Sequence, residues 1–448
     1  MIERKAYAQL KEWKKKNGAT ALLIEGARRV GKSTLAEEFA KNEYRSYLML
    51  DFAIVPSSVK ELFDVYGDNL DALFLYLSTY YGVTLYPRES LIIFDEIQLF
   101  PKARGLIKYL VHDGRYDYIE TGSLISIKKN TEDILIPSEE EPLRLNPLDF
   151  EEFLIARGEA SLVHVLQQAA NDLVPLPQAI HMKSMHLFRE YILVGGMPQA
   201  VDTYIKTSSF AETDQVKRLI LNLYRNDITR YAKGYESKVT AIFDQISSQL
   251  SKQEKKFTLA SLGTNARRAN YEEAFFWLQD AQIANLCYNN TDPNVGLGLH
   301  RDSPTLKCYM ADTGLLISHA FSDNRSTPEH VYRDILFDKL SLNEGMFAEN
   351  IVAQSLVATG HSLYFYSRSD RANASERMEI DFLIVDDSAR AKLSPIEVKS
   401  NKRYGLTSMD KFSAKYARKT GRQHVLHTKN ISVEQNRVFL PIYMAGYL

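Results

Sequence analysis

The sequence predicts an α/β protein in which a helical region separates two sheet-containing regions. Over residues 1–150, short apolar strands alternate with helices, a pattern typical of a parallel sheet covered by helices on both faces. Helical patterns dominate residues 151–337, and strand candidates return over residues 338–448. Because 448 residues exceed one ordinary domain, we expect three domains with these boundaries.

Composition narrows the class of protein. Hydrophobic residues make up 45% of the chain and charged residues 25%, as in ordinary globular proteins. The formal net charge of -1 argues against a surface that is positive throughout, although it is compatible with a local basic groove. The two cysteines, Cys287 and Cys308, indicate a reducing, cytoplasmic setting rather than a disulfide scaffold. We expect neither a signal peptide nor a membrane span, because no apolar run is long enough.

The strongest pattern is a glycine-rich loop between a strand and a helix. Residues 26–33 read Gly-Ala-Arg-Arg-Val-Gly-Lys-Ser and match the phosphate-binding pattern G-x-x-x-x-G-K-[ST]. The apolar run 21–25 before the loop is typical of a buried strand, and residues 34–42 after it have the apolar spacing of a helix. The loop and both of its neighbours therefore agree on a nucleotide-binding structure.

The residue types of the loop explain its chemistry. Gly26 and Gly31 let the backbone curl so that its N–H groups face phosphate oxygens, beside the positive N-terminal end of a helix. Lys32 is expected to reach the β- and γ-phosphates, and Ser33 to offer a hydroxyl to Mg²⁺. We therefore predict an ATP site formed by Gly26, Ala27, Arg28, Arg29, Val30, Gly31, Lys32, Ser33 and Thr34.

A second motif predicts hydrolysis as well as binding. Four apolar residues, 91–94, lead into Asp95 and Glu96. Asp95 is expected to hold Mg²⁺ beside the loop, and Glu96 to activate the attacking water. Thr121, at the tip of the next predicted strand, suits a contact with the γ-phosphate as well as it suits a plain turn.

Residues near the C-terminus suggest a second site. Asp381 lies on one predicted strand, and Glu397 and Lys399 lie on the next. Side chains two residues apart on a strand point to the same face, so Glu397 and Lys399 project together, and a hairpin brings Asp381 beside them. Asp381 and Glu397 can hold Mg²⁺ against a phosphate while Lys399 supports a water nucleophile. Glu349, on the preceding predicted helix, adds a further metal ligand at the edge of this site.

The middle region contains a pattern similar to a helix-turn-helix. Residues 257–262 and 271–278 have helical spacing, with Gly263 near the turn. Local positive charge suits contact with phosphates; it comes from Lys255, Lys256, Arg267 and Arg268. The alternative interpretation, slightly favoured, is that these helices pack the first domain against the last.

The motifs, taken in order, resemble a family of prokaryotic AAA-superfamily ATPases that carry a C-terminal domain of unknown function. The resemblance is carried by residues 26–34, 93–98, 121–123, 144–150, 195–198, 225–231, 311–315, 347–350, 379–382 and 396–400. It implies an AAA-type P-loop ATPase domain, a central region of winged-helix character and a C-terminal restriction-endonuclease-like domain. In AAA-type ATPases, a neighbouring subunit commonly supplies an arginine that completes the site. The candidates for such an arginine are Arg144, Arg225 and Arg230. Each of them fits equally well as a partner in a surface ion pair.

Two functions follow from this resemblance. The first is a cytoplasmic Mg²⁺-dependent ATPase coupled to a nuclease-like domain that binds or cleaves DNA or RNA. The second is an ATP-controlled interaction switch, in which an inactive nuclease-like domain docks a partner. A homo-oligomer is compatible with both.

Overall fold

A computed structural model of the chain describes residues 2–122, 138–252, 254–262, 270–337, 344–368, 376–386, 392–401 and 403–448. The chain forms two compact units, Met1–Asn146 and Pro147–Leu448. The division lies close to the domain boundary expected at residue 150. The two regions that the sequence analysis separated at residue 337 both lie in the second unit.

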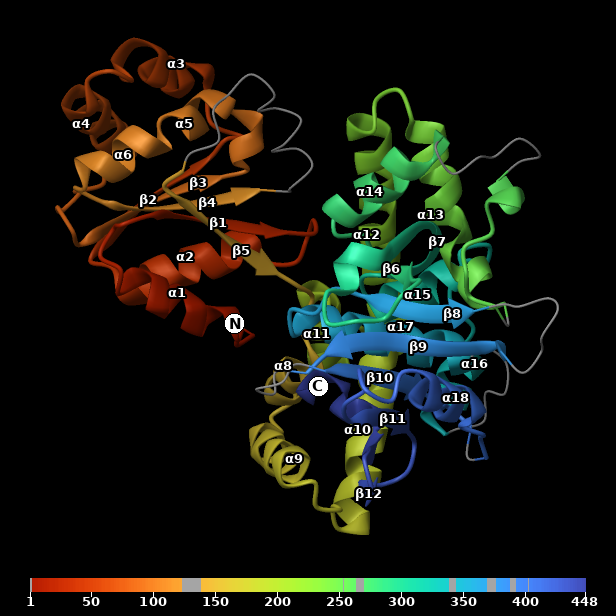
Figure 1. The fold of residues 1–448 in the computed structure, drawn as a ribbon. Helices are drawn as coiled ribbons and strands as arrows, with labels where there is room; N and C mark the ends of the chain where they lie inside the picture. Colours follow the sequence, from red (N-terminus) through yellow and green to blue (C-terminus); the bar gives the residue numbers. More distant parts are fainter. Residues whose placement is uncertain are drawn as a thin grey trace. The chain divides into compact units, whose positions relative to one another are not determined.

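The first unit contains a five-stranded sheet in the order β2-β3-β4-β1-β5, and every printed pairing in it is parallel (Figure 1). This agrees with the parallel sheet that the alternating pattern predicts. The strands are β1 (Ala21–Gly26), β2 (Ser46–Asp51), β3 (Ser90–Asp95), β4 (Asp117–Gly122) and β5 (Glu140–Leu145). The helices are α1 (Ala6–Lys14), α2 (Lys32–Glu43), α3 (Ser57–Tyr66), α4 (Leu70–Tyr81), η1 (Ile97–Leu99), α5 (Pro101–Gly105) and α6 (Ile107–Asp113).

Helices cover both faces of this sheet. Leu23 and Phe94 belong to a buried cluster that continues into α3, α4 and α6 on one face. Helices α1 and α2 lie on the other face, where Trp13 of α1 packs against Phe39 of α2 (Figure 1). Successive strand residues point to opposite faces, so a strand buried on both sides must be apolar at nearly every position. The strands β1 and β3 meet that requirement.

The second unit contains a mixed eight-stranded sheet in the order β12-β13-β11-β10-β9-β8-β6-β7. Its strands are β6 (Ala284–Asn290), β7 (Arg301–Met310), β8 (Tyr364–Arg368), β9 (Met378–Val385), β10 (Leu393–Val398), β11 (Gln423–His427), β12 (Ser432–Glu434) and β13 (Arg437–Pro441). The pairs β6–β7, β8–β9 and β9–β10 are antiparallel, whereas β6–β8, β10–β11 and β11–β13 are parallel.

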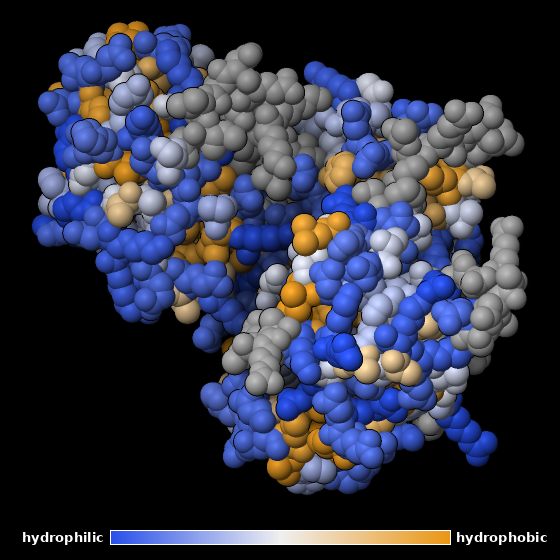
Figure 2. All heavy atoms as spheres, viewed as in Figure 1, coloured by the Kyte–Doolittle hydropathy of each residue, from blue (hydrophilic) through white to orange (hydrophobic). Residues whose placement is uncertain are grey.

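Many helices accompany this sheet. They are α8 (Phe150–Ala156), α9 (Ala160–Asp172), α10 (Gln178–Val194), α11 (Pro198–Thr207), α12 (Phe210–Tyr231), α13 (Glu236–Leu250), η2 (Leu259–Leu262), α14 (Glu272–Asp280), η4 (Leu297–His300), α15 (Thr313–Ala320), α16 (Glu329–Leu336), α17 (Glu344–Ala358), α18 (Thr407–Lys415) and η6 (Ile442–Tyr447). In the part of the chain that the structure describes, no helix combines the length and the apolar composition that a bilayer span needs. Figure 2 shows hydrophilic residues over most of the visible face of each unit, with small hydrophobic patches between them.

The middle region differs from the expected helix-turn-helix. Only a short 3₁₀ turn, η2, forms within residues 257–262, because the Phe257 N–H donates to Leu306 O and the Thr258 N–H donates to the Gln249 side chain. The second expected helix is present as α14, and residues 263–269 lie outside the described residues. Strands β6 and β7 pair with each other, and β6 also pairs with β8, so the two strands of the middle region belong to the C-terminal sheet.

Candidate functional site

The phosphate-binding loop connects β1 to α2 with the geometry that its glycines require. Gly31 precedes α2 with a φ of 97°, a left-handed conformation that favours glycine. A Cβ atom on Gly26 would lie 2.6 Å from Leu145 O and 2.7 Å from a methyl group of Val30, so only glycine fits there. Arg29 also has a positive φ, of 70°. The loop is thus curled tightly at the N-terminal end of α2, where helix N–H groups favour an anion.

The side chain of Lys32 lies inside this curl. Its side chain is buried, and Nζ donates to Gly26 O at 2.9 Å and to Ala27 O at 3.2 Å. Both acceptors belong to the loop itself. The ammonium group therefore lies against the backbone that the sequence predicts to surround the phosphates.

Three predicted side chains meet at one carboxylate oxygen. Ser33 Oγ donates to Asp95 Oδ1 at 2.6 Å, and Thr121 Oγ1 donates to the same oxygen. This convergence arises because β3 and β4 are neighbouring parallel strands, so Asp95 and Thr121 both lie at the carboxyl edge of the sheet. Hydroxyl and carboxylate oxygens are the ligands that Mg²⁺ prefers, so Ser33 and Asp95 fit a shared magnesium ion.

Glu96 lies next to this group in an unusual backbone conformation. Its φ is 52°, and its N–H donates to Thr121 Oγ1 at 3.3 Å. The Gln98 amide donates to Glu96 Oε2, which orients the carboxylate. Sequence reasoning assigned no role to Gln98. The available signal was its position two residues after Glu96, which allows its amide to reach the Glu96 carboxylate when the chain forms a short helical turn there.

The three candidate arginine fingers have different surroundings. Arg144 lies exposed on β5, opposite Glu25 of β1, in the same unit as the loop. Arg225 and Arg230 lie on α12 of the second unit. Arg225 pairs with Asp244 at 2.5 Å and covers the ring of Phe243, whereas Arg230 is exposed and lies over the ring of Tyr231.

In the second unit, Asp381 and Glu397 lie on neighbouring antiparallel strands. Phe382 of β9 pairs with Ile396 of β10, so the next cross-strand positions are Asp381 and Glu397. The Val398 N–H donates to Asp381 Oδ2 at 2.8 Å. Burial and, to a smaller extent, the nearby Glu349 raise the pKa of Asp381 to about 7, and burial also raises the pKa of Glu397. The structure thus brings together the two carboxylates that the sequence places on a hairpin.

Glu397 has one oxygen without a partner. Its side chain is buried, Oε2 pairs with Lys399, and Oε1 has no hydrogen-bond partner among the described residues. An unpaired buried carboxylate oxygen beside a second carboxylate is costly unless a cation offsets it. Asp381 and Glu397 therefore fit a divalent ion held by oxygen ligands.

Glu349 differs from its expected role as a metal ligand. The Tyr309 hydroxyl donates to Glu349 Oε2 at 3.0 Å, Lys307 lies 3.5 Å from the same oxygen, and Lys255 pairs with Oε1. The pKa of Glu349 is lowered despite its burial, because both lysines stabilise the carboxylate. Among the residues with described positions, no group of three or more His, Cys, Asp or Glu side chains is arranged to hold a metal ion. The expected ligand set of Glu349, Asp381 and Glu397 therefore does not form as a group of three.

Sequence reasoning missed two residues of this cluster, Lys307 and Glu379. Lys307 lies on β7, and its Nζ is 3.0 Å from Glu379 Oε1. Its side chain is 1% exposed. A lysine within the otherwise apolar run around residues 305–310 was the available signal, because lysine is rarely buried without a partner.

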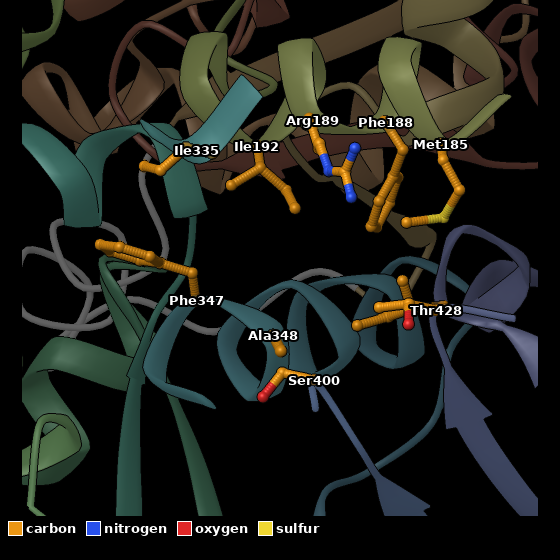
Figure 3. A pocket seen from close by; sticks show the side chains of 10 residues that line it. Met185, Phe188, Arg189, Ile192, Ile335, Phe347, Ala348, Ser400 and Thr428 are labelled. Atoms are coloured by element: carbon orange, nitrogen blue, oxygen red, sulfur yellow. The ribbon is translucent and has the colours of Figure 1, made fainter. Parts of the chain in front are cut away.

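A separate cavity lies between α10, α17 and the ends of β10 and β11 (Figure 3). Most of its lining is apolar, including Phe188, Ile192 and Phe347, and Arg189 extends into it from α10. None of the described residues that line it carries a carboxylate, so it is distinct from the cluster around Asp381 and Glu397.

Three family models match different parts of the chain. Residues 18–154 match an AAA domain, residues 185–326 match a domain of unknown function (DUF8612), and residues 344–445 match another domain of unknown function (DUF4143). No curated protein matches the sequence. The match over residues 18–154 and the loop geometry agree, so the first unit contains an AAA-type P-loop ATPase domain.

Solved structures with partial similarity include DNA-bound Drosophila ORC, with 16% identity and a TM-score of 0.28, covering 68% of this chain and 92% of that one. Cdc6p from Pyrobaculum aerophilum has 9% identity and a TM-score of 0.27, with coverage of 76% and 97%. AMPPCP-bound DnaA from Aquifex aeolicus has 12% identity and a TM-score of 0.28, with coverage of 76% and 95%. The assignment of the ATPase domain rests on the family match and the loop, not on these structures.

Proposed function

Because the first unit contains an AAA-type ATPase domain, we propose that this chain binds ATP with Mg²⁺ and hydrolyses it. The observation that supports hydrolysis most directly is the convergence of Ser33 and Thr121 on one oxygen of Asp95. Binding alone needs the loop and Lys32. Hydrolysis needs in addition a carboxylate near the terminal phosphate that can position water, and Glu96 directly follows Asp95.

Each residue has a distinct task in this proposal. The loop N–H groups and Lys32 bind the β- and γ-phosphates, and Ser33 and Asp95 hold the metal. Mg²⁺, when bound, neutralises charge on the phosphates. Glu96, oriented by Gln98, accepts a proton from the attacking water.

The test is the change Glu96→Gln, which keeps the shape of the side chain but removes the base. We expect ATP affinity to be retained and turnover to fall by roughly 100-fold or more. Glu89→Gln is the matched control, because Glu89 lies on the surface in an ion pair with Arg45. Turnover of Glu96→Gln equal to that of the parent would show that Glu96 is not the base.

For the second unit, we propose a nuclease-like domain that binds or cleaves DNA or RNA with a divalent ion. The supporting observation is the pair Asp381 and Glu397, with its unpartnered buried oxygen and with Lys399 beside it. Two carboxylates can hold an ion against a phosphodiester, and Lys399 can stabilise the developing charge.

The competing proposal is an ATP-controlled interaction switch with an inactive docking domain. The observation that favours it is the charge balance of the cluster. Among the described residues, the carboxylates Glu349, Glu379, Asp381 and Glu397 are accompanied by the ammonium groups of Lys255, Lys256, Lys307 and Lys399. Such a cluster can persist as an ion-paired core without catalysis.

One experiment separates the two proposals. The full chain is incubated with ATP, Mg²⁺ or Mn²⁺, and single- or double-stranded DNA or RNA. If the nuclease proposal is correct, the double change Asp381→Asn with Glu397→Gln abolishes cleavage and leaves ATP hydrolysis largely intact. Asp410→Asn, an exposed carboxylate paired with Arg437, is the control. Nucleotide-dependent association without cleavage of any substrate would select the switch.

A further inference from the structure

Lys307 is a buried cation surrounded by carboxylates from two elements. Its Nζ lies 3.0 Å from Glu379 Oε1, 3.5 Å from Glu349 Oε2 and 3.9 Å from Asp381 Oδ1. Glu379 and Asp381 are two residues apart on β9 and therefore share a face, and Glu349 comes from α17. The three carboxylates thus converge on one ammonium group.

The contacts of Lys307 with Glu379 and Asp381 join two strands, β7 and β9, that are not neighbours in the sheet. Strands β6 and β8 lie between β7 and β9 in the sheet. The ammonium lies 5.0 Å from the centre of the Phe365 ring of β8, so a cation–π contact also stabilises its charge. The side chain of Lys307 is 1% exposed, and a buried ammonium group strongly destabilises the fold unless carboxylates pair with it. Here three carboxylates surround the ammonium group.

The carboxylates of the cluster differ in how lysines neutralise them. Glu349 and Glu379 each pair with Lys307 and with a second lysine, Lys255 or Lys256. Burial raises the pKa of Glu397, whereas the lysines lower the pKa of Glu349 and of Glu379. Glu397 has no ion pair with Lys307 within 4.0 Å among the described contacts and keeps an unpartnered oxygen.

We propose that Lys307 is a built-in cation that takes the place of a divalent ion among Glu349, Glu379 and Asp381. As they stand around Lys307, these carboxylates are not arranged to hold an ion among the described residues. Without the ammonium group, three carboxylates that draw in to metal–oxygen distances are a suitable ligand set for Mg²⁺ or Mn²⁺. Lys307 fills the space between them, so metal binding in this cluster is confined to the pair Asp381 and Glu397. The proposal refines the C-terminal site proposed above, because it sets how many ions that site accepts.

The test is Lys307→Met, which keeps a long apolar side chain and removes the charge. Mn²⁺ binding is measured by titration with the nucleotide-free full chain, in an Asp95→Asn background that removes the ATP-site ligand. We expect Lys307→Met to bind one more Mn²⁺ per chain than the parent. The added Glu379→Gln change should abolish that extra ion, because Glu379 makes the shortest contact to Lys307.

Two controls isolate the buried charge. The change Lys307→Arg retains the cation. The change Lys256→Met removes a lysine whose side chain is 23% exposed and whose place water can take. Neither variant should bind an additional ion. If Lys307→Met is too unstable to titrate, its melting temperature is compared with and without Mn²⁺, and the rise should exceed that of the parent.

The outcomes for the two proposals are distinguishable. No extra ion and no larger rise in melting temperature for Lys307→Met would overturn the role of Lys307. A parent protein that binds no ion dependent on Glu397 would instead overturn the proposed metal site of Asp381 and Glu397. An extra ion in Lys307→Met that survives Glu379→Gln would also contradict the inference.

Discussion

His319 shows how one buried side chain can set a pH dependence. It lies on α15 against the ring of Phe243, and Nδ1 is 3.2 Å from Ser247 Oγ. Burial and, to a smaller extent, the nearby Arg225 lower its pKa from 6.5 to about 4. Between pH 6.5 and pH 4 the unfolded chain therefore binds more protons than the folded one, and stability falls as the pH falls. The full loss is about 3 kcal/mol.

We predict that His319→Gln makes the unfolding free energy of the second unit less dependent on pH between 7 and 4. The residual slope comes from other buried histidines, such as His424, whose pKa burial lowers to about 4. Chemical denaturation at several pH values measures the slope. The exposed His164 provides the control variant, His164→Gln. A slope unchanged by His319→Gln would mean that His319 binds protons equally in the folded and unfolded states, so that burial does not lower its pKa.

At the same scale, the sequence allows site residues to be proposed where they lie in one contiguous motif, and their roles stay predictions. The loop from Gly26 to Thr34 and Asp95 could be assigned because local spacing determines their geometry. Lys307 could not, because its partner Glu379 lies far along the chain and meets it only after the sheet forms. Glu349 lies in the cluster to which the sequence assigns it, but its lysine partners could not be foreseen because they are equally remote in sequence. Its role as a metal ligand stays a prediction.

At the scale of elements, strands with a mostly apolar sequence were predictable, including the edge strand β2, whereas the polar edge strand β5 was not. The runs that became β1 and β3 are buried on both faces, and their sequences are apolar at most positions. Strand β4 is equally buried although it reads Asp-Tyr-Ile-Glu-Thr-Gly. Strand β5 lies at the sheet edge and reads Glu-Glu-Pro-Leu-Arg-Leu, with an alternating burial pattern that resembles a loop. The pairing of β6 with β8 also lay beyond prediction, because it joins regions that the hydrophobic pattern separates.

The turn after α10 is hydrogen-bonded to the start of α15 and leads into α11. Gly195 ends α10 with a φ of 83°, and a Cβ atom on it would lie 2.3 Å from Asp312 Oδ1. Asp312 accepts the Gly196 N–H at 2.5 Å and caps α15 through the Leu315 N–H at 2.8 Å. The turn thus joins the end of α10, the start of α11 and the start of α15.

We predict that Gly195→Ala destabilises the second unit by more than about 2 kcal/mol, because it adds a steric clash to the strain of a left-handed alanine. Gly234→Ala is matched in φ, at 91°, but a Cβ atom there meets nothing within 4 Å. That control should cost only about 1 kcal/mol. Denaturant unfolding of both variants gives the difference, and equal losses would show that Asp312 moves aside without cost.

At the scale of the whole molecule, the groups proposed to hydrolyse ATP and two of the arginine candidates belong to different units. Lys32, Asp95 and Glu96 lie in the first unit, and Arg225 and Arg230 lie on α12 of the second. Arg225 is held by Asp244 and by the ring of Phe243, whereas Arg230 is exposed. We therefore expect Arg230, rather than Arg225, to complete the ATP site of a neighbouring chain in an ATP-dependent homo-oligomer.

We predict that Arg230→Ala lowers ATP turnover by roughly 10³-fold, the usual contribution of an arginine finger, while Arg225→Ala leaves turnover close to that of the parent. Mixing Arg230→Ala with Glu96→Gln should restore activity, because the first chain supplies an intact base and the second supplies the arginine. Sedimentation of Glu96→Gln should show an oligomer that forms only with ATP. A mixture that stays inactive, together with a monomer at every protein concentration, would exclude an arginine supplied by a neighbouring chain. Arg144, in the same unit as the loop, would then become the candidate to test by Arg144→Ala.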